Sequence, residues 1–184
     1  MTGRSPLHLL AISGSLRKAS TNTAALEALA RLAPPDMQVI VYRGLADLPP
    51  FNPDQDAEDV AKPEAVEDLR VCVAAADALI IASPEYAHGI AGALKNALDW
   101  LVASEAFPGK PVVLLNAAPR AFHAQAALCE ILATMSARLL PEAFVTLPLT
   151  GKTITADDIL ADPVFVRALS ESLTALAGVL RGQR

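Results

Sequence analysis

The residues best suited to chemistry follow the first apolar run of this 184-residue chain. Residues 7–12 predict a buried strand, and the polar segment 13–22 separates them from a helical pattern. Its glycine and small hydroxyl side chains let backbone N–H groups converge, and the next helix adds partial positive charge. Arg17 adds a planar cation. The segment therefore predicts a phosphate site; the alternative is a polar turn capped by Ser20 or Asn22.

A second candidate is the segment Ser-Pro-Glu-Tyr-Ala-His-Gly at residues 83–89, which follows the apolar run 78–82. Pro84 fixes the direction of the chain there, and Gly89 allows a close approach of backbone. Backbone amides of such a loop can hydrogen-bond the edge of a flat heterocycle, with Tyr86 standing against it. The alternative is a structural turn in which Tyr86 covers the following helix.

The third candidate loop, Asn-Ala-Ala-Pro-Arg-Ala at residues 116–121, follows the apolar run 111–116. It lies on the same side of the expected sheet as the other two loops. It can line the other edge of a bound ring, and a purely structural loop is an equal alternative.

The sequence lacks the residue patterns that are typical of metal sites, serine hydrolases and P-loop proteins. His8, His88 and His123 have no metal-ligand spacing. The sequence contains neither a Gly-x-Ser-x-Gly elbow nor a Gly-x-x-x-x-Gly-Lys-Ser/Thr loop. Hydride chemistry needs no protein nucleophile, because a flavin would carry the reactive atom and the protein would orient it.

Five apolar runs alternate with helical patterns along residues 1–184, which we interpret as one domain. The expected strands are 7–12, 37–42, 78–82, 111–116 and about 142–147, and the expected helices are 23–33, a helix starting at Pro63, one around 94–101, one around 128–135 and 163–180. This alternation predicts an α/β fold with a parallel sheet covered by helices on both faces.

The strand order follows from the first loop. A dinucleotide-binding domain needs Gly-x-Gly-x-x-Gly after its first strand, and this loop has only Gly14. The flavodoxin-like three-layer sandwich, a five-stranded parallel sheet in the order 2-1-3-4-5, fits better. In that order the loops after strands one and three meet at the switch point, where ligands bind.

The amino-acid composition limits the classes of partner that the protein is expected to bind. Hydrophobic residues make up 53% of the chain, charged residues 19%, and the net charge is -5 with no block of basic residues. Nucleic acids and anionic membranes are therefore not expected partners. Cys72 and Cys129 form no Cys-x-x-Cys pattern. Neither a signal peptide nor an apolar run of about 18 residues is evident, so we expect a soluble cytoplasmic protein.

Two motifs together carry a family resemblance. Residues 14–22 (GSLRKASTN) and 83–100 (SPEYAHGIAGALKNALDW) resemble the NADPH-dependent FMN reductase family, which includes flavodoxin-like quinone, chromate and azo-dye reductases. The resemblance implies that the FMN phosphate is held by Ser15, Arg17, Ser20, Thr21 and Asn22. It implies that the isoalloxazine is lined by Pro84, Glu85, Tyr86, Ala87, His88 and Gly89, and on its other side by Ala117, Ala118, Pro119 and Arg120.

The resemblance also implies an activity and an assembly. NADPH or NADH would reduce FMN, and a small acceptor such as a quinone would take the electrons in a ping-pong cycle. The chains would form homodimers or homotetramers, with the helix that carries Trp100 at the contact.

The sequence departs from the family at Ala87, often Asn in relatives, at Ala91, often Pro, and in the third loop. An FMN-binding electron carrier and a regulatory member without flavin stay open as alternatives.

Overall fold

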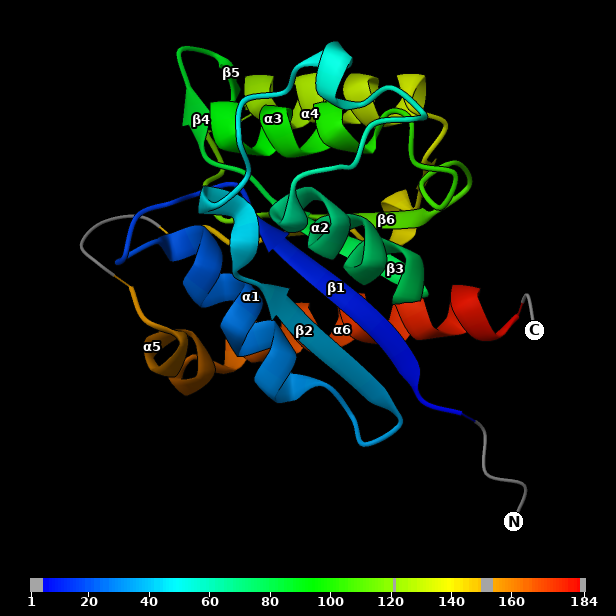
Figure 1. Cartoon of the computed structure of the whole chain (residues 1–184). Coiled ribbons are helices and arrows are strands. Elements are labelled where there is room, and N and C mark those ends of the chain that lie inside the picture. Colours follow the sequence, from blue (N-terminus) through cyan, green and yellow to red (C-terminus); the bar gives the residue numbers. More distant parts are fainter. Residues whose placement is uncertain (1–4, 121, 150–153, 183–184) are drawn as a thin grey trace.

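The sheet that carries the candidate loops is parallel throughout. The computed structural model describes residues 5–120, 122–149 and 154–182. The four longer strands are β1 (Leu7–Ser13), β2 (Met37–Tyr42), β3 (Ala78–Ala82) and β6 (Pro111–Asn116), hydrogen-bonded in the order β2-β1-β3-β6 (Figure 1). The predicted flavodoxin-like order is therefore confirmed, and three of these strands have the predicted bounds.

The fifth position of the sheet is split between two short strands. β7 (Arg138–Leu139) pairs with the start of β6, and β8 (Val145–Thr146) pairs with its end. Between them the chain forms the 3-10 turn η3 (Pro141–Ala143). Pro141 has no N–H to donate to a ladder, so one continuous strand cannot form there. The prediction of one strand over residues 142–147 was correct only at β8.

Helices cover both faces of the sheet (Figure 1). On one face lie α1 (Thr21–Leu32), the short α5 (Ala156–Ala161) and α6 (Pro163–Arg181), and on the other lie α2 (Glu64–Ala75), α3 (Gly92–Leu101) and α4 (Phe122–Thr134). The strand residues alternate between the two cores: Leu9 and Ala11 face the first, Leu10 and Ile12 the second.

The segment after β3 is a hairpin rather than an irregular loop. β4 (Glu85–Tyr86) and β5 (Gly89–Ile90) pair antiparallel around Ala87 and His88, whose φ angles are 50° and 60°. Two successive positive φ values define a tight turn that normally selects Asn-Gly. Because Ala-His carries no such signature, the sequence did not reveal the hairpin.

The proline-rich segment after β2 folds onto α3. It contains two 3-10 turns, η1 (Gly44–Ala46) and η2 (Pro53–Gln55). The Pro49 carbonyl accepts hydrogen bonds from Trp100 Nε1 at 2.8 Å and Asn96 Nδ2 at 2.9 Å. Trp100 is fully buried beneath this segment. The Trp100 side chain is therefore used inside one chain, and the expectation that the helix carrying it lies at a contact between chains stays a prediction.

Among the residues that the structure describes, one helix, α6, is long and apolar enough to cross a membrane by length and composition alone. Its leucines at positions 169, 173, 176 and 180 are buried in the core beneath the sheet. This burial is typical of the core helix of an α/β domain.

Candidate functional site

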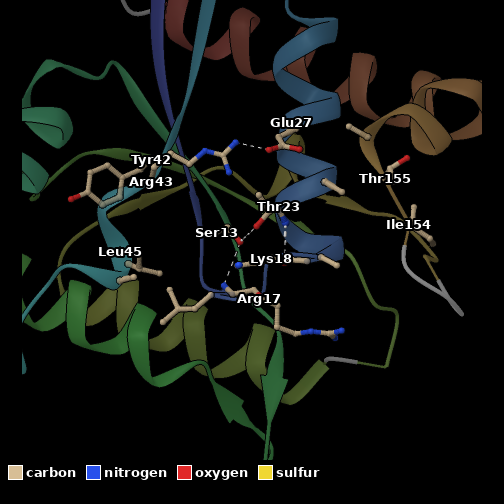
Figure 2. Close-up of a pocket in the computed structure, with 17 residues that line it drawn as sticks. Ser13, Arg17, Lys18, Thr23, Glu27, Tyr42, Arg43, Leu45, Ile154 and Thr155 are labelled. Carbon is tan, nitrogen blue, oxygen red and sulfur yellow. Dashed lines mark hydrogen bonds and ion pairs between the residues drawn. The ribbon is translucent and has the colours of Figure 1, made fainter.

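Serine side chains organise the loop after β1. Ser13 Oγ accepts hydrogen bonds from the hydroxyl of Thr23 at 2.8 Å and from the Ser15 N–H at 3.3 Å (Figure 2). Ser15 Oγ in turn accepts from the Arg17 N–H at 3.4 Å. Ser13 is buried, whereas Arg17 is exposed. The hydrogen bond between Thr23 and Ser13 thus attaches the loop to α1, while the Arg17 side chain stays exposed to solvent.

The loop leads directly into the positive end of α1. Ser20 is the N-cap: its Oγ accepts from the Thr23 N–H at 3.2 Å, and its carbonyl accepts from the Ala24 N–H at 2.9 Å. Thr21 and Asn22 precede the first of these helical bonds, so helix geometry gives their N–H groups no intrahelical acceptor. Such donors at a helix N-terminus favour an anion. The residues present therefore fit a phosphate group.

Gly14 holds the loop against the neighbouring strand. Its N–H donates to the Ala82 carbonyl at 2.7 Å. A Cβ at this position would lie 3.2 Å from Leu94 Cβ and 3.3 Å from Ser83 Oγ. Glycine is needed here for close packing of β1, β3 and α3, which places the first two candidate loops side by side.

A pocket of about 450 Å³ opens beside the phosphate loop (Figure 2). Of the five predicted phosphate residues, Ser15, Arg17 and Ser20 line it, while Thr21 and Asn22 do not. None of residues 84–89, 118 or 119 lines this pocket either. This pocket is therefore lined by the first loop and not by the predicted ring-binding residues, although Gly14 packs that loop against Ser83 just before the hairpin.

The far wall of the pocket carries an ion pair and a buried phenol. Arg43, which directly follows β2, donates to Glu27 on α1 at 2.5 Å. Tyr42 is buried, and burial raises the pKa of its phenol, with the neighbouring Asp68 carboxylate adding to the shift. The Tyr42 phenol therefore stays protonated and uncharged, and the accessible positive charge of the pocket comes from Arg17 and Lys18.

The hairpin after β3 is fixed at both ends by side chains. Ser83 Oγ donates to the Pro84 carbonyl at 2.9 Å and accepts from the Ala91 N–H at 3.3 Å. Glu85 Oε2 accepts from the Ala124 N–H, in the first turn of α4, at 2.8 Å. The carboxylate of Glu85 is thus engaged by α4, which leaves its backbone as the part that can face a flavin ring.

Asn116 shapes the loop after β6. Its Oδ1 accepts from the Ala118 N–H at 3.0 Å, and its Nδ2 donates to Gln125 Oε1 at 2.8 Å. Ala118 and Pro119 are exposed beyond this turn. The loop follows a neighbouring strand on the same edge of the sheet as the other two, as predicted.

Each of the three loops also exposes a large apolar side chain. Leu16 follows β1 and is 57% exposed, Tyr86 follows β3 and is 54% exposed, and Phe122 follows β6 and is 62% exposed. All three residues follow strands at the carboxyl edge of the sheet, and we call them the apolar rim; exposed apolar side chains at such an edge suit a flat aromatic ligand. Within the described residues, no group of three or more His, Cys, Asp or Glu side chains could hold a metal ion.

The fold is a flavodoxin-like domain, and the loop after β1 at its switch point has donors that fit an anion. The family model for NADPH-dependent FMN reductases matches residues 7–151. The chain belongs to this family, as the resemblance implied.

Individual relatives agree with that assignment. The chain is 42% identical over 118 residues to an NAD(P)H-dependent FMN reductase of Pseudomonas aeruginosa, covering 63% of this chain and 62% of the relative. It is 36% identical over 110 residues to a quinone reductase of Escherichia coli K12, covering 59% and 58%. These matches span about three fifths of each relative.

The fold is also found in a solved flavoenzyme. The structure of FerB, an NAD(P)H:(acceptor) oxidoreductase from Paracoccus denitrificans, superposes with a TM-score of 0.82 at 25% identity. The similarity covers 96% of this chain and 98% of that chain.

Sequence reasoning gave no individual role to several residues that shape the site, although Ser13 and Asn116 lie within the candidate segments 13–22 and 116–121. Ser13 and Asn116 are the last residues of β1 and β6, and both organise the loop that follows. A polar residue at the end of an otherwise apolar strand was the available signal. The sequence gave no such signal for Arg43, because its ion pair with Glu27 on α1 depends on the path of the chain after β2.

Proposed function

We propose that this protein is an FMN-dependent oxidoreductase that takes hydride from NADPH or NADH and passes it to a small acceptor such as a quinone. The observation that carries the proposal is the loop after β1, which offers serine hydroxyls and helix-terminal N–H groups and packs through Gly14 against Ser83, just before the hairpin. When bound, FMN supplies the two-electron chemistry.

The residues of this chain have distinct tasks in that proposal. The N–H groups of Thr21 and Asn22 and the hydroxyls of Ser15 and Ser20 bind the phosphate, and Arg17 neutralises its charge. The loop from Pro84 to Gly89 orients the ring on one side, with Ala118 and Pro119 on the other. The two substrates then use the same open face in turn, which predicts ping-pong kinetics.

The rim of Leu16, Tyr86 and Phe122 supports a further part of the proposal, an assembly of two or four copies. Exposed apolar side chains on three adjacent loops are surface that a second copy can cover. We propose that the homodimer works in the cytoplasm. Light scattering on the purified protein measures the assembly directly, and a monomer at micromolar concentration would reject it.

The phosphate assignment is tested by titrating the protein, freed of flavin, with FMN and following flavin fluorescence. Arg17→Ala removes a charge-assisted contact of about 2 kcal/mol, so the Kd for FMN should rise about 30-fold. Riboflavin lacks the phosphate, and its affinity should not change. Arg167→Ala, which removes an exposed cation on α6, is the matched control.

Two results would reject the proposal. Equal affinity of wild type and Arg17→Ala for FMN would reject the phosphate site. The second result concerns FMN-loaded protein. If adding benzoquinone does not increase its rate of NADPH or NADH oxidation, the protein is a flavin-binding carrier rather than a reductase.

A further inference from the structure

Two histidines that lie 35 positions apart in the sequence stack on each other beside the candidate site. His88 is the second residue of the hairpin turn, and His123 lies in the first turn of α4. Their ring centroids are 4.1 Å apart with an interplanar angle of 25°. Phe122 adds a third ring, 4.0 Å from His123. The loops after β3 and β6 are thus joined by an aromatic stack.

The histidine pair (His88 and His123) is both anchored and accessible. The bond from the Ala124 N–H to Glu85 holds the hairpin on α4 directly beside the stack. His88 is exposed, His123 is half-buried, and Phe122 is largely exposed. A planar ligand bound between the loops after β3 and β6 would therefore meet this pair, whose relative orientation is set by the stack.

Few other charges surround the histidine pair. On the hairpin, Glu85 is engaged by α4, and Tyr86 carries a phenol. Arg120 precedes α4, and the next charged residue within α4 is Glu130, about two turns further on. Cys129 is the other titratable group of that helix, and burial raises the pKa of its thiol, which keeps it protonated.

The reduction of a quinone requires a proton as well as a hydride. One carbonyl oxygen receives the hydride with its electron pair, and the other oxygen is left as an oxyanion. The oxyanion becomes a hydroxyl when it takes a proton. Imidazole changes protonation near neutral pH, whereas a phenol or a guanidinium releases its proton poorly there.

We propose that His123, held in place by its stack with His88, is the proton donor to a quinone-like acceptor. The inference rests on the proposed function, because NAD(P)H must supply the hydride. The imidazolium gives its proton to the oxyanion and becomes neutral imidazole, and solvent water restores the proton. Two electrons and one hydrogen arrive as hydride, one proton arrives from His123, and the product is the hydroquinone.

The deciding experiment compares two acceptors in the FMN-loaded protein. Ferricyanide takes electrons without a proton, whereas benzoquinone needs one. His123→Gln keeps a planar polar side chain but cannot act as the acid, so benzoquinone turnover should fall about 100-fold while ferricyanide turnover stays at the wild-type level. His8→Gln is the matched control, since His8 lies at the start of β1 and contacts Gln38.

Equal losses with both acceptors, or no loss with benzoquinone, would overturn the assignment of His123. Failure of the proposed function gives a different result: wild-type protein would oxidise NADPH with neither acceptor.

A second measurement does not depend on turnover. Para-nitrophenol is a redox-inert phenol under these conditions, and its phenolate absorbs visible light. An imidazolium positioned to protonate the acceptor's oxyanion also stabilises a bound phenolate, so the bound dye should remain phenolate to a lower pH than the free dye, and His123→Gln should abolish that difference. A bound dye that titrates like the free dye in wild-type protein would contradict the proposal.

Discussion

Asp56 and Arg70 form the most buried of the five ion pairs in the described part of the chain, with side-chain exposures of 7% and 17%. One guanidinium nitrogen of Arg70 lies 2.7 and 2.9 Å from the two carboxylate oxygens. Arg70 also donates twice to the Trp100 carbonyl, at 2.7 and 3.1 Å. The pair therefore fastens the segment after β2 to both α2 and α3.

We predict that Asp56→Ala lowers the free energy of unfolding by about 3 kcal/mol, the lower end of the range for breaking a buried pair. The lower end applies because Arg70 keeps the Trp100 carbonyl as an acceptor and is partly hydrated. Asp56→Asn keeps a neutral acceptor and should cost about half as much. For a domain of this length, the larger loss corresponds to a fall in Tm of about 6–12 °C.

Urea denaturation followed by circular dichroism measures these differences. The control is Asp99→Ala, which breaks the exposed pair with Lys95 on α3 and should cost about 0.3–0.5 kcal/mol. The reasoning is refuted if Asp56→Ala and Asp99→Ala destabilise the protein equally, since burial is the only reason for the predicted difference.

Three further predictions concern single positions. Ala87→Asn should raise the free energy of unfolding, measured by urea denaturation, by about 0.5–1 kcal/mol, because Asn tolerates the positive φ of this turn. The control Ala118→Asn, at a position with negative φ, should not raise the free energy of unfolding. Burial lowers the pKa of Lys110 below its ordinary value of 10.5, so the unfolded chain holds this proton more firmly and wild-type stability should rise as the pH approaches that value. Lys110→Met should lose this rise in urea midpoints. Gly14→Ala should cost about 1–3 kcal/mol and weaken FMN binding, since its Cβ would crowd Leu94; unchanged thermal melting and FMN titration would contradict this.

The sheet was predictable because its central strands β1, β3 and β6 are almost entirely buried, while the edge strand β2 is still a short apolar run. Residues 37–42, 78–82 and 111–116 are short apolar runs with turn signals at their ends, and the structure has strands at these bounds. The fifth position was not predictable as two strands. Pro141, which interrupts the ladder, is visible in the sequence, but the pairing of Arg138–Leu139 with the start of β6 is a tertiary contact with no local signature.

The site was predictable to the level of loops but not of side chains. Strand order alone places the three loops on one edge of the sheet. The directions of side chains depend on contacts between loops, such as the bond between Glu85 and the first turn of α4. For the same reason, the sequence indicated His88 and His123 separately but not their stack.

These contacts couple the second loop to the third. Both Glu85 and His88 bind the hairpin to the start of α4, and Asn116 fixes the turn before α4 through Gln125. The hairpin is therefore positioned partly by α4, and a change in the third loop also moves the second. The departures from the family at Ala87 and in the third loop lie on the two sides of this contact. They should therefore affect the ring-binding region together, while the phosphate loop, which is tied to α1 through Ser13 and Thr23, remains independent of them.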